Sequence, residues 1–512
     1  MTLADLLFAP AVPVDPGAPA VHAGGVDHSW VELRAWAEAV AADLGAAGIR
    51  PGQAVGVMLP NGPELVATLF GVWGAGAVYV PVNPRLTDDE VANVLASVDP
   101  ALVVTTADDQ QRIVDRPVAV VRRGDGFRLG PPAVEPNTSG RTTFDEDVAL
   151  VSFTSGTTGR PKPVLLTHSG VVTLLDGVIG TLRGGRGATG DRGGARPRPM
   201  PNLIPVSLSL WAGIYNVLFA LRVGAPVVLM DGFDPVELAA LVKRFGIRST
   251  VLPPAAMVSL VEDERVADLE PLRLVRSITA PLSPLQARRF RDRFGISVLN
   301  SYGQTEIGGE IVGWSAADSR AHGDDKLGSV GRPHAGVEVR IADEGPYGAG
   351  ELQVRTPAMS AGYADGADLA DRLTDDGWFR TGDIARVDGD GFVWIEGRLS
   401  DMVNRGGLKV FPAEVEEVLR SSPDVADAAV VGRPDDRLGE VPVAFVVPAP
   451  GVALSSDGLS DYCRARLAPY KVPVRFETMR ALPRNEVGKV LKAALQAGLH
   501  DQATSAVRES HA

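Results

Sequence analysis

Residues Val151–Thr167 read VSFTSGTTGRPKPVLLT, an apolar strand-like run that opens into glycines, hydroxyl residues and a lysine. Glycines free the backbone so that successive N–H groups can turn toward one anion. Hydroxyl groups add further donors, and the lysine adds a mobile positive charge. The composition therefore predicts a phosphate-binding loop made of Thr154, Ser155, Gly156, Thr157, Thr158, Gly159 and Lys162.

This segment is not a Walker A loop, in which Gly, Lys and Ser or Thr follow one another directly. A hairpin turn rich in glycine and threonine is the alternative interpretation. Four hydroxyl residues, two glycines and one lysine within the nine positions Thr154–Lys162 favour phosphate binding over a plain turn. Pro163 follows the lysine, where it fixes φ and removes one N–H donor.

Strand and helix patterns alternate on both sides of the loop. Strands that alternate with helices of about ten to fifteen residues predict crossover connections and mainly parallel sheets. Such sheets bind ligands beyond the carboxyl ends of their strands. The helical patterns are Val31–Leu44, Glu64–Trp73 and Pro235–Phe245, and the strand patterns lie within Gly52–Asn61 and at Ala101–Thr105, Ala225–Met230 and Ser249–Leu252.

The pattern changes after about Val337, where VEVRI, ELQVR and GFVWIEG are short alternating strands separated by Gly and Asp. They predict a small antiparallel, barrel-like β unit. After Gly397 a compact α+β pattern begins, so we place a domain boundary at Arg398–Asp401. The expected fold is α/β: residues 1–397 form a large domain of two crossover-type subdomains plus the β unit, and residues 398–512 form a small α+β domain. Its expected elements are the helices Pro412–Leu419 and Leu459–Leu467 and the strands Ala428–Val431 and Val441–Val447.

The overall composition excludes several classes of protein. At about 150 residues per domain, 512 residues correspond to three or four units. The 50 Lys and Arg against 63 Asp and Glu give a net charge of −13, which argues against nucleic acid or an anionic membrane as partner. One segment, Arg183–Arg198, has five arginines and one aspartate, and we interpret it as a surface loop rather than an RNA-binding tract.

Two further features concern localisation. The single cysteine, Cys463, cannot form an internal disulfide, which fits a reducing compartment such as the cytoplasm. The uncharged run Leu65–Val82 is just long enough to span a membrane, but three glycines and Pro81 interrupt it. We therefore expect a buried helix, a turn and a short strand there, no membrane span, and no signal peptide at the N-terminus.

Four more motifs follow the phosphate loop in order: SYGQTE at Ser301–Glu306, RTGD at Arg380–Asp383, GRLSDMVNRGGLKVFPAEVE at Gly397–Glu416, and PRNEVGKVLK at Pro483–Lys492. Together with TSGTTGRPK they resemble the signature of the adenylate-forming superfamily. That superfamily includes acyl- and aryl-CoA synthetases, adenylation domains of peptide synthetases, and luciferases. The resemblance covers nearly the whole chain, and the chain looks most like the synthetases of acyl- and aryl-CoA.

The resemblance implies an ATP-dependent ligase that joins a carboxylate to ATP, releases pyrophosphate, and passes the acyl group from acyl-AMP to a thiol. Catalysis of this kind rests on stabilising phosphate charge. Thr154 to Thr158 and Lys162 would hold the β- and γ-phosphates, Glu306 would hold Mg²⁺, and Thr305 would contact the α-phosphate. Ser301, Tyr302 and Gly303 with the loop Thr279, Ala280 and Pro281 would border adenine, and Asp383 with Arg398 would bind the ribose hydroxyls.

The resemblance also assigns two roles to the small domain, which is mobile in the family. Lys489 would neutralise the attacking carboxylate and the α-phosphate in the adenylation transition state. A rotation would then bring the glycine loop with Gly406 and Gly407 to the acyl-adenylate for the thiol step. The family's hinge residue is usually Asp or Lys, whereas this chain has Ser400 followed by Asp401. That departure leaves the details of domain closure open.

The region Ile204–Ile214, IPVSLSLWAGI, departs further from the family pattern because it has no histidine and no acidic residue. Relatives that activate amino acids place an aspartate there, since a buried ammonium needs a counter-charge. The expected substrate is therefore a carboxylic acid without an α-amino group. Trp211 and Tyr215 lie at i, i+4 and either line the acid pocket or pack in the core.

The acceptor is expected to be CoA, with a separate carrier protein or an amine as the alternative. Luciferase-like oxidation of the acyl-AMP is a further alternative. A non-catalytic nucleotide-binding relative is another, but such a protein would be expected to lack Lys489, Glu306 or Asp383, and all three are present. The expected small-molecule partners are thus the acid, ATP with Mg²⁺, and CoA, and no motif indicates an oligomeric state.

Overall fold

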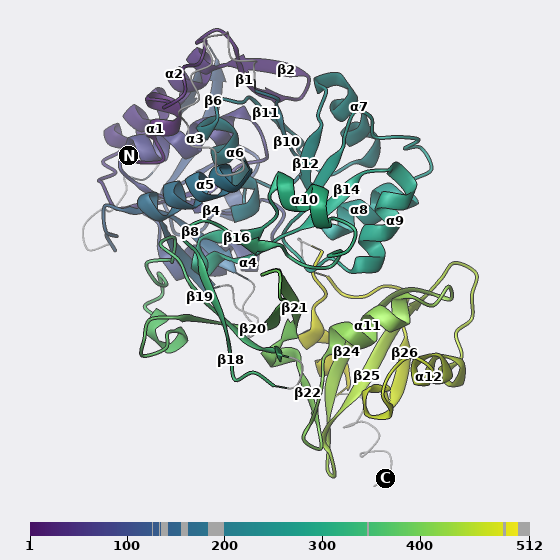
Figure 1. Ribbon diagram of the computed structural model, residues 1–512. Helices are drawn as coiled ribbons and strands as arrows, with labels where there is room; N and C mark the ends of the chain where they lie inside the picture. Colours follow the sequence, from purple (N-terminus) through teal and green to yellow (C-terminus); the bar gives the residue numbers. More distant parts are fainter. Residues whose placement is uncertain are drawn as a thin grey trace.

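The computed structural model describes residues 1–124, 126–132, 134, 142–154, 162–182, 199–345, 348–484 and 488–499. A large N-terminal part contains several sheets, and a smaller C-terminal part lies below it in Figure 1. The predicted α/β fold class, with a small α+β unit at the C-terminal end, is confirmed. The segment Arg183–Arg198, which we interpreted as a surface loop, lies outside the described residues.

The largest sheet carries the strand that leads toward the predicted phosphate loop. Over the described residues it has the strand order β7-β6-β5-β3-β4-β8-β9, and the pairs from β6 to β8 are parallel. Inner strands such as β3 are buried at every residue, which explains their continuous apolar sequence. The strands are β3 (Ala54–Met58), β4 (Val78–Pro81), β5 (Leu102–Thr105), β6 (Val118–Gly124), β7 (Gly126–Leu129), β8 (Val148–Thr154) and β9 (Lys162–Thr167).

Local sequence sets the ends of the helices beside this sheet. In α2 (Trp30–Ala46), Ser29 and Glu32 cap each other's backbone N–H groups. α3 (Pro63–Gly74) begins at a proline, whose missing N–H is not needed in the first turn. At Gly71 an added Cβ would lie 2.5 Å from the Cβ of Val40, so this glycine allows α2 and α3 to pack closely. α4 (Asp88–Val98) begins with the same capping box as α2.

The uncharged run Leu65–Val82 folds as predicted into a buried helix, a turn and a strand, namely α3 and β4. Gly76 makes the turn with a φ of 70°, a left-handed conformation that favours glycine. In the part of the chain that the structure describes, no helix has the length and apolar character needed to cross a membrane.

A second group of parallel strands lies beside the first. β12, β13 and β14 pair in parallel, and Thr250 Oγ1 of β12 donates to the carbonyl of Leu203 in β10 at 2.9 Å. The predicted helix Pro235–Phe245 and the predicted strand Ser249–Leu252 have these bounds in the structure. The elements are β1 (Pro19–Ala23), β2 (Val26–Ser29), β10 (Asn202–Ile204), β11 (Val227–Leu229), β12 (Ser249–Leu252), β13 (Leu274–Ser277), β14 (Ser297–Asn300), α1 (Asp5–Phe8), α5 (His168–Leu182), α6 (Trp211–Arg222), α7 (Pro235–Phe245), α8 (Pro254–Glu262) and α9 (Pro284–Phe294).

Antiparallel strands follow, as the sequence predicted. β15 to β17 form one small sheet, and β18 to β21 form an antiparallel sheet in sequence order. β20 and β21 are joined in register so that Asp383 faces Arg398 across the ladder. The elements are β15 (Tyr302–Gln304), η2 (Thr305–Ile307), β16 (Gly309–Gly313), α10 (Ala316–His322), β17 (Arg332–Pro333), β18 (Glu338–Ala342), β19 (Gly350–Arg355), β20 (Phe379–Val387), β21 (Val393–Arg398) and η5 (Leu399–Asp401).

The C-terminal part has its own apolar core, which includes Val430, Leu419 and Cys463. β24 and β25 are longer than predicted because they form a continuous hairpin. The predicted helix Leu459–Leu467 instead begins at Ser456, because Ser455 caps it by accepting from the Gly458 N–H. The elements are β22 (Val403–Arg405), β23 (Leu408–Val410), α11 (Pro412–Arg420), β24 (Val425–Asp435), β25 (Gly439–Pro448), α12 (Ser456–Arg464) and β26 (Arg475–Thr478), and residues 492–499 form a helix that was not predicted.

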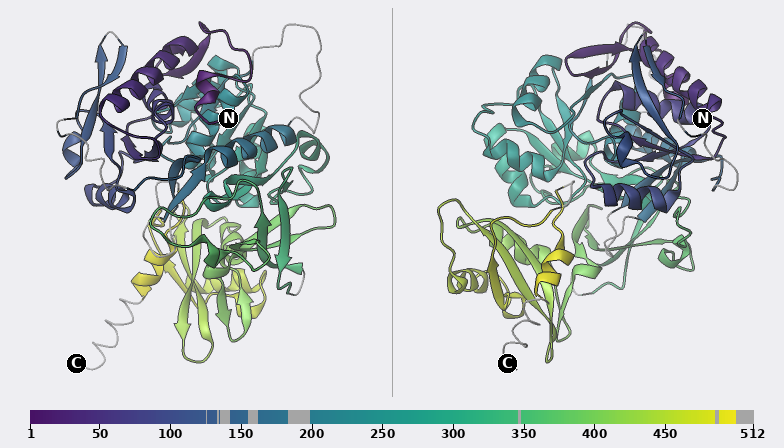
Figure 2. Two further views of the ribbon diagram at one scale, coloured as in Figure 1. Left: turned by 90° about the vertical axis from the view of Figure 1, so that its left-hand side faces the viewer. Right: turned by 180° about the vertical axis from the view of Figure 1, so that it is seen from behind.

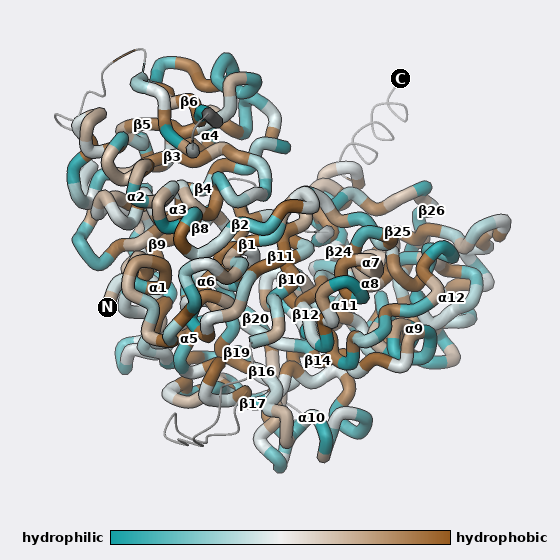
Figure 3. The backbone as a smooth tube through the Cα atoms, turned by 90° about the horizontal axis from the view of Figure 1, so that it is seen from above, coloured by the Kyte–Doolittle hydropathy of each residue, from teal (hydrophilic) through white to brown (hydrophobic). Residues whose placement is uncertain are grey.

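Two further views show how the parts meet. Figure 2 shows the small C-terminal sheet below the large part from the side and from behind. In Figure 3 the apolar residues gather on central strands such as β3, β11 and β14. At the contact between the parts, the backbone N–H of Leu285 at the start of α9 donates to Glu417 of α11 at 3.1 Å.

Candidate active site

Asp383 is the centre of a buried polar network at one end of the site. Its Oδ2 accepts from the Tyr302 hydroxyl at 2.6 Å and from Gln304 Nε2 at 2.7 Å, and Arg398 Nε lies 3.0 Å from Oδ1. Asp383 itself is 4% exposed. The structure therefore brings together three residues that were predicted to bind the nucleoside, from β15, β20 and β21, and adds Gln304, which the sequence reasoning missed.

The partners in this network take most of the acceptor positions of the Asp383 carboxylate before any ligand binds. A carboxylate has about four acceptor positions, and three are taken here. Burial and the Asp383 charge raise the pKa of Tyr302 well above its ordinary value, so its hydroxyl stays protonated and donates. Asp383 was expected to accept from both ribose hydroxyls, and this would require one present partner to move away.

The predicted adenine loop follows β13 directly. Thr279 has a φ of 72°, a left-handed conformation that is costly for a β-branched residue and marks functional loops. The Ser301 hydroxyl, at the end of the neighbouring β14, donates to the carbonyl of Ser277 at 3.0 Å. Since β13 and β14 are parallel, their carboxyl ends bring Ala280 and Pro281 to the same edge as Ser301.

Gly303 is required by close backbone packing. A Cβ added there would lie 1.7 Å from the carbonyl oxygen of Gly309, on the opposite strand of the β15–β16 hairpin. Any side chain at this position would separate β15 from β16. Gly303 therefore holds Tyr302, Thr305 and Glu306 in a fixed relation to β16.

Glu306 lies in the short helix η2 and is 7% exposed. The Tyr363 hydroxyl donates to Glu306 Oε1 at 3.5 Å, and Lys162 Nζ lies 5.5 Å from the centre of the Tyr363 ring. Burial and the Glu306 charge raise the pKa of Tyr363 to about 12. The structure thus joins Lys162 and Glu306 through Tyr363, which the sequence reasoning missed because it lies outside the motifs used.

The protein carboxylate that would be available to a metal ion at this position is Glu306. Among the described residues no group of three His, Cys, Asp or Glu side chains could hold a metal ion. Mg²⁺ is commonly held by one or two carboxylates together with substrate phosphates. The single buried carboxylate of Glu306 fits such a shared site better than an all-protein metal site.

The predicted phosphate loop is only partly described. β8 and β9 are antiparallel neighbours, with Thr154 opposite Lys162. Ser155, Gly156, Thr157, Thr158 and Gly159 lie outside the described residues. The base of the loop nevertheless places Lys162 beside Tyr363 and hence on the Glu306 side of the site.

Lys489 lies where the small domain meets the large one. Burial lowers its pKa, the nearby charge of Arg398 lowers it further, and Asp401 and Asp383 act in the opposite direction. A Cβ added to the neighbouring Gly488 would lie 3.0 Å from the Cβ of Ala255 in α8. The structure therefore brings Lys489 near Asp383, although the two residues are 106 positions apart in the sequence.

The predicted hinge, Ser400 and Asp401, and the predicted glycine loop with Gly406 and Gly407 each make contacts within the small domain. Asp401 accepts from the Ser400 hydroxyl at 3.1 Å and lies 3.9 Å from Lys492 Nζ. Gly406 and Gly407 have φ values of 59° and 88° and form the turn between β22 and β23. The Gly406 N–H donates to Leu438 within the small domain, and β22 lies at the lower end of the molecule in Figure 1.

A second buried polar network lies beside α6. Arg276 of β13 is ion-paired with Glu310 of β16, and His334 Nε2 lies 3.3 Å from Glu310 Oε1. Trp211 Nε1 donates to the carbonyl of Gly308 at 2.9 Å, and its ring contacts Tyr215 edge-on with centroids 5.9 Å apart. Tyr215 packs in the main apolar core, as one of the two interpretations predicted.

This network was not predicted from the sequence. The sequence predicted no histidine here because none occurs between His168 and His322, whereas His334 reaches Glu310 from a later loop. Arg276 and Glu310 are 34 positions apart and belong to different sheets. No spacing rule links them, so only the folded chain reveals the pair.

Known proteins share this architecture and its motifs. The family of AMP-binding enzymes matches residues 8–364, and the C-terminal domain of AMP-binding enzymes matches residues 414–489. Feruloyl-CoA synthase from an Amycolatopsis species is 34% identical and covers 94% of this chain and 96% of the relative. Indoleacetate–CoA ligase from Aromatoleum aromaticum is 31% identical and covers 94% of each chain.

Solved structures of similar proteins agree with this assignment. The amide bond synthetase McbA from Marinactinospora thermotolerans has a TM-score of 0.82 at 28% identity and covers 97% of this chain and 99% of its own. ATP-bound MatB from Rhodopseudomonas palustris has a TM-score of 0.84 at 26% identity with the same coverage. The chain therefore belongs to the family of AMP-binding enzymes, the adenylate-forming superfamily, and within it to the acyl- and aryl-CoA synthetase type.

Proposed function

We propose that this protein activates a carboxylic acid without an α-amino group as acyl-AMP, with release of pyrophosphate, and then forms an acyl-CoA thioester. The observation that supports the proposal is the position of Lys489 at the contact with α8, near enough to Asp383 and Arg398 for their charges to act on it. A cation at that position stabilises the negative charge that develops when a carboxylate attacks the α-phosphate.

The proposed roles follow from chemistry and position. Lys489 and Thr305 act on the α-phosphate while the acid's carboxylate oxygen bonds to phosphorus and pyrophosphate leaves. Asp383, with Tyr302 and Arg398, positions the ribose, and the loop at Ala280 and Pro281 borders adenine. Lys162 and the hydroxyl-rich segment after Thr154 hold the β- and γ-phosphates. Glu306 would hold Mg²⁺, which when bound neutralises phosphate charge.

The proposal that the acid lacks an α-amino group rests on the absence of a carboxylate that could pair with an ammonium group. An α-ammonium group needs a carboxylate beside it, and Ile204–Ile214 contains none. Glu310 of β16, whose charge acts on Tyr215, is already paired with Arg276. It cannot serve an ammonium without leaving Arg276 uncompensated.

For the second step we propose that residues 398–512 rotate about Ser400 and Asp401 as a small domain. This rotation carries the Gly406–Gly407 turn toward the acyl-adenylate. CoA is the proposed acceptor, in keeping with the CoA ligases among the relatives. We further place the enzyme in the cytoplasm, where ATP and CoA are available.

A second acceptor has one specific observation in its favour. The amide bond synthetase McbA, whose name describes amide formation, matches the fold over 97% of this chain. We therefore propose an amine as the alternative acceptor, and a separate carrier protein as the third.

The test is a panel of aryl, fatty and short branched acids, each incubated with ATP and Mg²⁺ and with CoA, an amine or neither. Pyrophosphate release reports the first step, and mass spectrometry identifies acyl-CoA, amide or acyl-AMP as product. We expect release that depends on an acid and an acyl-CoA product. Amide without acyl-CoA would favour the alternative, and no release with any acid would contradict the adenylation function.

A further inference from the structure

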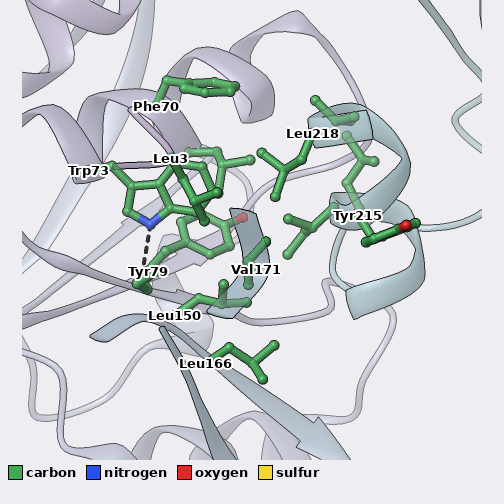
Figure 4. Packing of buried hydrophobic residues seen from close by; sticks show 14 of the residues in the cluster. Leu3, Phe70, Trp73, Tyr79, Leu150, Leu166, Val171, Tyr215 and Leu218 are labelled. Carbon is green, nitrogen blue, oxygen red and sulfur yellow. Dashed lines mark hydrogen bonds between the residues drawn. The ribbon is translucent and has the colours of Figure 1, made fainter. Parts of the chain in front are cut away.

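The residues Gly488–Lys492, which we call the lysine segment, make few apolar contacts. Figure 4 shows the packing typical of the large domain, where apolar side chains surround Tyr79 and Leu150. In the lysine segment Val490 packs against apolar residues of the β24–β25 hairpin, whereas Leu491 is 41% exposed. The segment therefore depends on polar contacts to keep a defined position.

Arg484 holds the peptide group that precedes Lys489. Its guanidinium donates to the carbonyl oxygen of Gly488, which belongs to the peptide bond between Gly488 and Lys489. Gly488 has a φ of 78°, and a glycine in this conformation leaves the backbone free to rotate. Arg484 and Val490 are also paired in an antiparallel β-bridge. Arg484 thus restrains a peptide group that the glycine alone would leave free to turn.

Arg484 is also one end of a chain of charged side chains that alternate in sign. Its guanidinium pairs with Asp427 Oδ2, and Arg420 Nε lies 3.0 Å from Oδ1 of the same carboxylate. Arg420 Nη2 lies 3.6 Å from Glu416 Oε2, and Lys492 Nζ lies 2.8 Å from Glu416 Oε1. One end of the chain is therefore bonded to the first residue of the lysine segment, and the other end is its last residue.

The middle of the chain is fixed to regular secondary structure. Glu416 of α11 is 8% exposed and also accepts from the Val430 N–H of β24 at 2.9 Å. Asp427 of β24 accepts from the Ala428 N–H at 2.8 Å. A buried carboxylate of this kind keeps its partners, because the loss of one leaves charge without compensation. The chain therefore ties both ends of the lysine segment to α11 and β24.

The Lys492 end of the chain has a second contact, at the predicted hinge. Lys492 Nζ lies 3.9 Å from Asp401 Oδ2. Burial is the largest cause of the lowered pKa of Lys489, and the positive charge of Lys492 lowers it further. A variant of Lys492 would thus affect the hinge and the charge of Lys489 together. The Arg484 end is bonded to the peptide group before Lys489 and is the better place to test position.

We propose that Arg484 and Asp427 are positioning residues for the adenylation step, and that through the chain they hold Lys489 where its ammonium group reaches the α-phosphate. The inference rests on the proposed adenylation function. A misplacement of about 1 Å in a reacting group costs about a hundredfold in rate, so the restraint at Gly488 affects the reaction directly. Acyl transfer, which in the proposed function uses the Gly406–Gly407 turn, does not need this restraint.

The test measures the two half-reactions separately in Arg484→Met, Asp427→Asn and the double variant. The acid is the one that the wild type activates fastest among benzoate, cinnamate, octanoate and isobutyrate. Acid-dependent exchange of pyrophosphate into ATP reports adenylation. Transfer from supplied acyl-AMP to CoA, or to an amine where the wild type uses one, reports the second step. Arg464→Met is the matched control, because Arg464 pairs with Asp461 on the exposed surface of the same domain.

We expect Arg484→Met to lower the kcat of exchange by about ten- to a hundredfold and to change acyl transfer by less than about twofold. Asp427→Asn leaves Arg484 bonded to Gly488, so the loss of exchange should be smaller, about three- to tenfold. The double variant should lose no more than Arg484→Met, because both changes remove the same link. Arg464→Met should behave like the wild type in both half-reactions.

Unchanged exchange in Arg484→Met, or an equal loss in both half-reactions, would overturn the inference while adenylation stands. Thermal melting verifies that each variant is folded. Asp427→Asn decides the question by the same two criteria if Arg484→Met does not fold. No acid-dependent exchange by the wild type with any of the acids would overturn the proposed function and this inference with it.

Discussion

Two buried polar networks flank the β15–β16 hairpin, and they differ in how far they are satisfied. At the nucleoside end the Tyr302 hydroxyl is bonded to Asp383, which also accepts from Gln304 and pairs with Arg398. At the acid end the Tyr215 hydroxyl has no partner among the described residues, although Arg276 and Glu310 lie beside it. The Tyr302 hydroxyl is thus bonded within its network, whereas the Tyr215 hydroxyl is not bonded among the described residues.

The difference has a physical reason. In the proposed function the ribose is the same for every substrate, so the present partners hold the Asp383 carboxylate in one orientation, and one of them moves away when both ribose hydroxyls bind. An acid pocket must distinguish between substrates. A buried hydrogen-bond donor without a partner weakens the binding of acids that offer no acceptor for it. Variants of one network alone therefore test whether the two networks act separately. A variant at Lys489, where the small domain meets the large one, should affect the reaction as a whole.

The largest effect is expected at the junction, from Lys489→Ala. This change removes the cation near Asp383, so adenylation should fall by at least about a hundredfold. Pyrophosphate exchange measures this step, and thioester formation from supplied acyl-AMP should largely persist. Lys471→Ala, which removes a small-domain lysine paired with Glu414, is the matched control and should behave like the wild type. Unchanged exchange in Lys489→Ala would contradict its assigned role.

At the acid end, Glu310 should make stability dependent on pH. Its pKa is lowered to about 2 from an ordinary value of 4.5, so its contribution is complete above about pH 4.5 and is lost as pH falls toward 2. The shift corresponds to at most about 3 kcal/mol. Urea unfolding of the wild type and Glu310→Gln at pH 7 and at lower pH measures it. A stability difference that does not shrink on acidification would show that the ion pair is not its cause.

At the nucleoside end, Asp383→Asn removes the charge that Tyr302, Gln304 and Arg398 surround. We expect the KM for ATP to rise about tenfold or more, because hydrogen bonds to a charged group are lost. The preference among acids should stay as in the wild type. Asp376→Asn is the control, since Asp376 is an exposed aspartate that pairs with Arg340. A change in acid preference in Asp383→Asn would mean that the two ends are not separate.

The smallest effect is expected from Tyr302→Phe. It removes one of three partners of Asp383 and leaves Gln304 and Arg398 in place, so the KM for ATP should change by about two- to tenfold. Steady-state kinetics with saturating acid measures the change. An unchanged KM for ATP in Tyr302→Phe would contradict the role proposed for its hydroxyl.

Much of the fold could be predicted because the signals were local. α7 was found at its predicted bounds, since Asp234 caps it and Gly246 ends it in a left-handed conformation. The predicted buried helix and strand within Leu65–Val82 followed from glycines that break the run. The helix at residues 492–499 was missed because its packing, through Leu495 and Leu499 against Val443 and Phe445, is not visible in its own short sequence.

The sequence by itself determined the family and the order of the motifs, because these are short stretches whose residue types carry the chemistry. Only the tertiary structure decided which groups meet. Tyr302 reaches Asp383 across 81 positions, and His334 reaches Thr181 across 153. Such pairings arise when strands and loops distant in the sequence pack together, and no spacing along the chain encodes the distance between them.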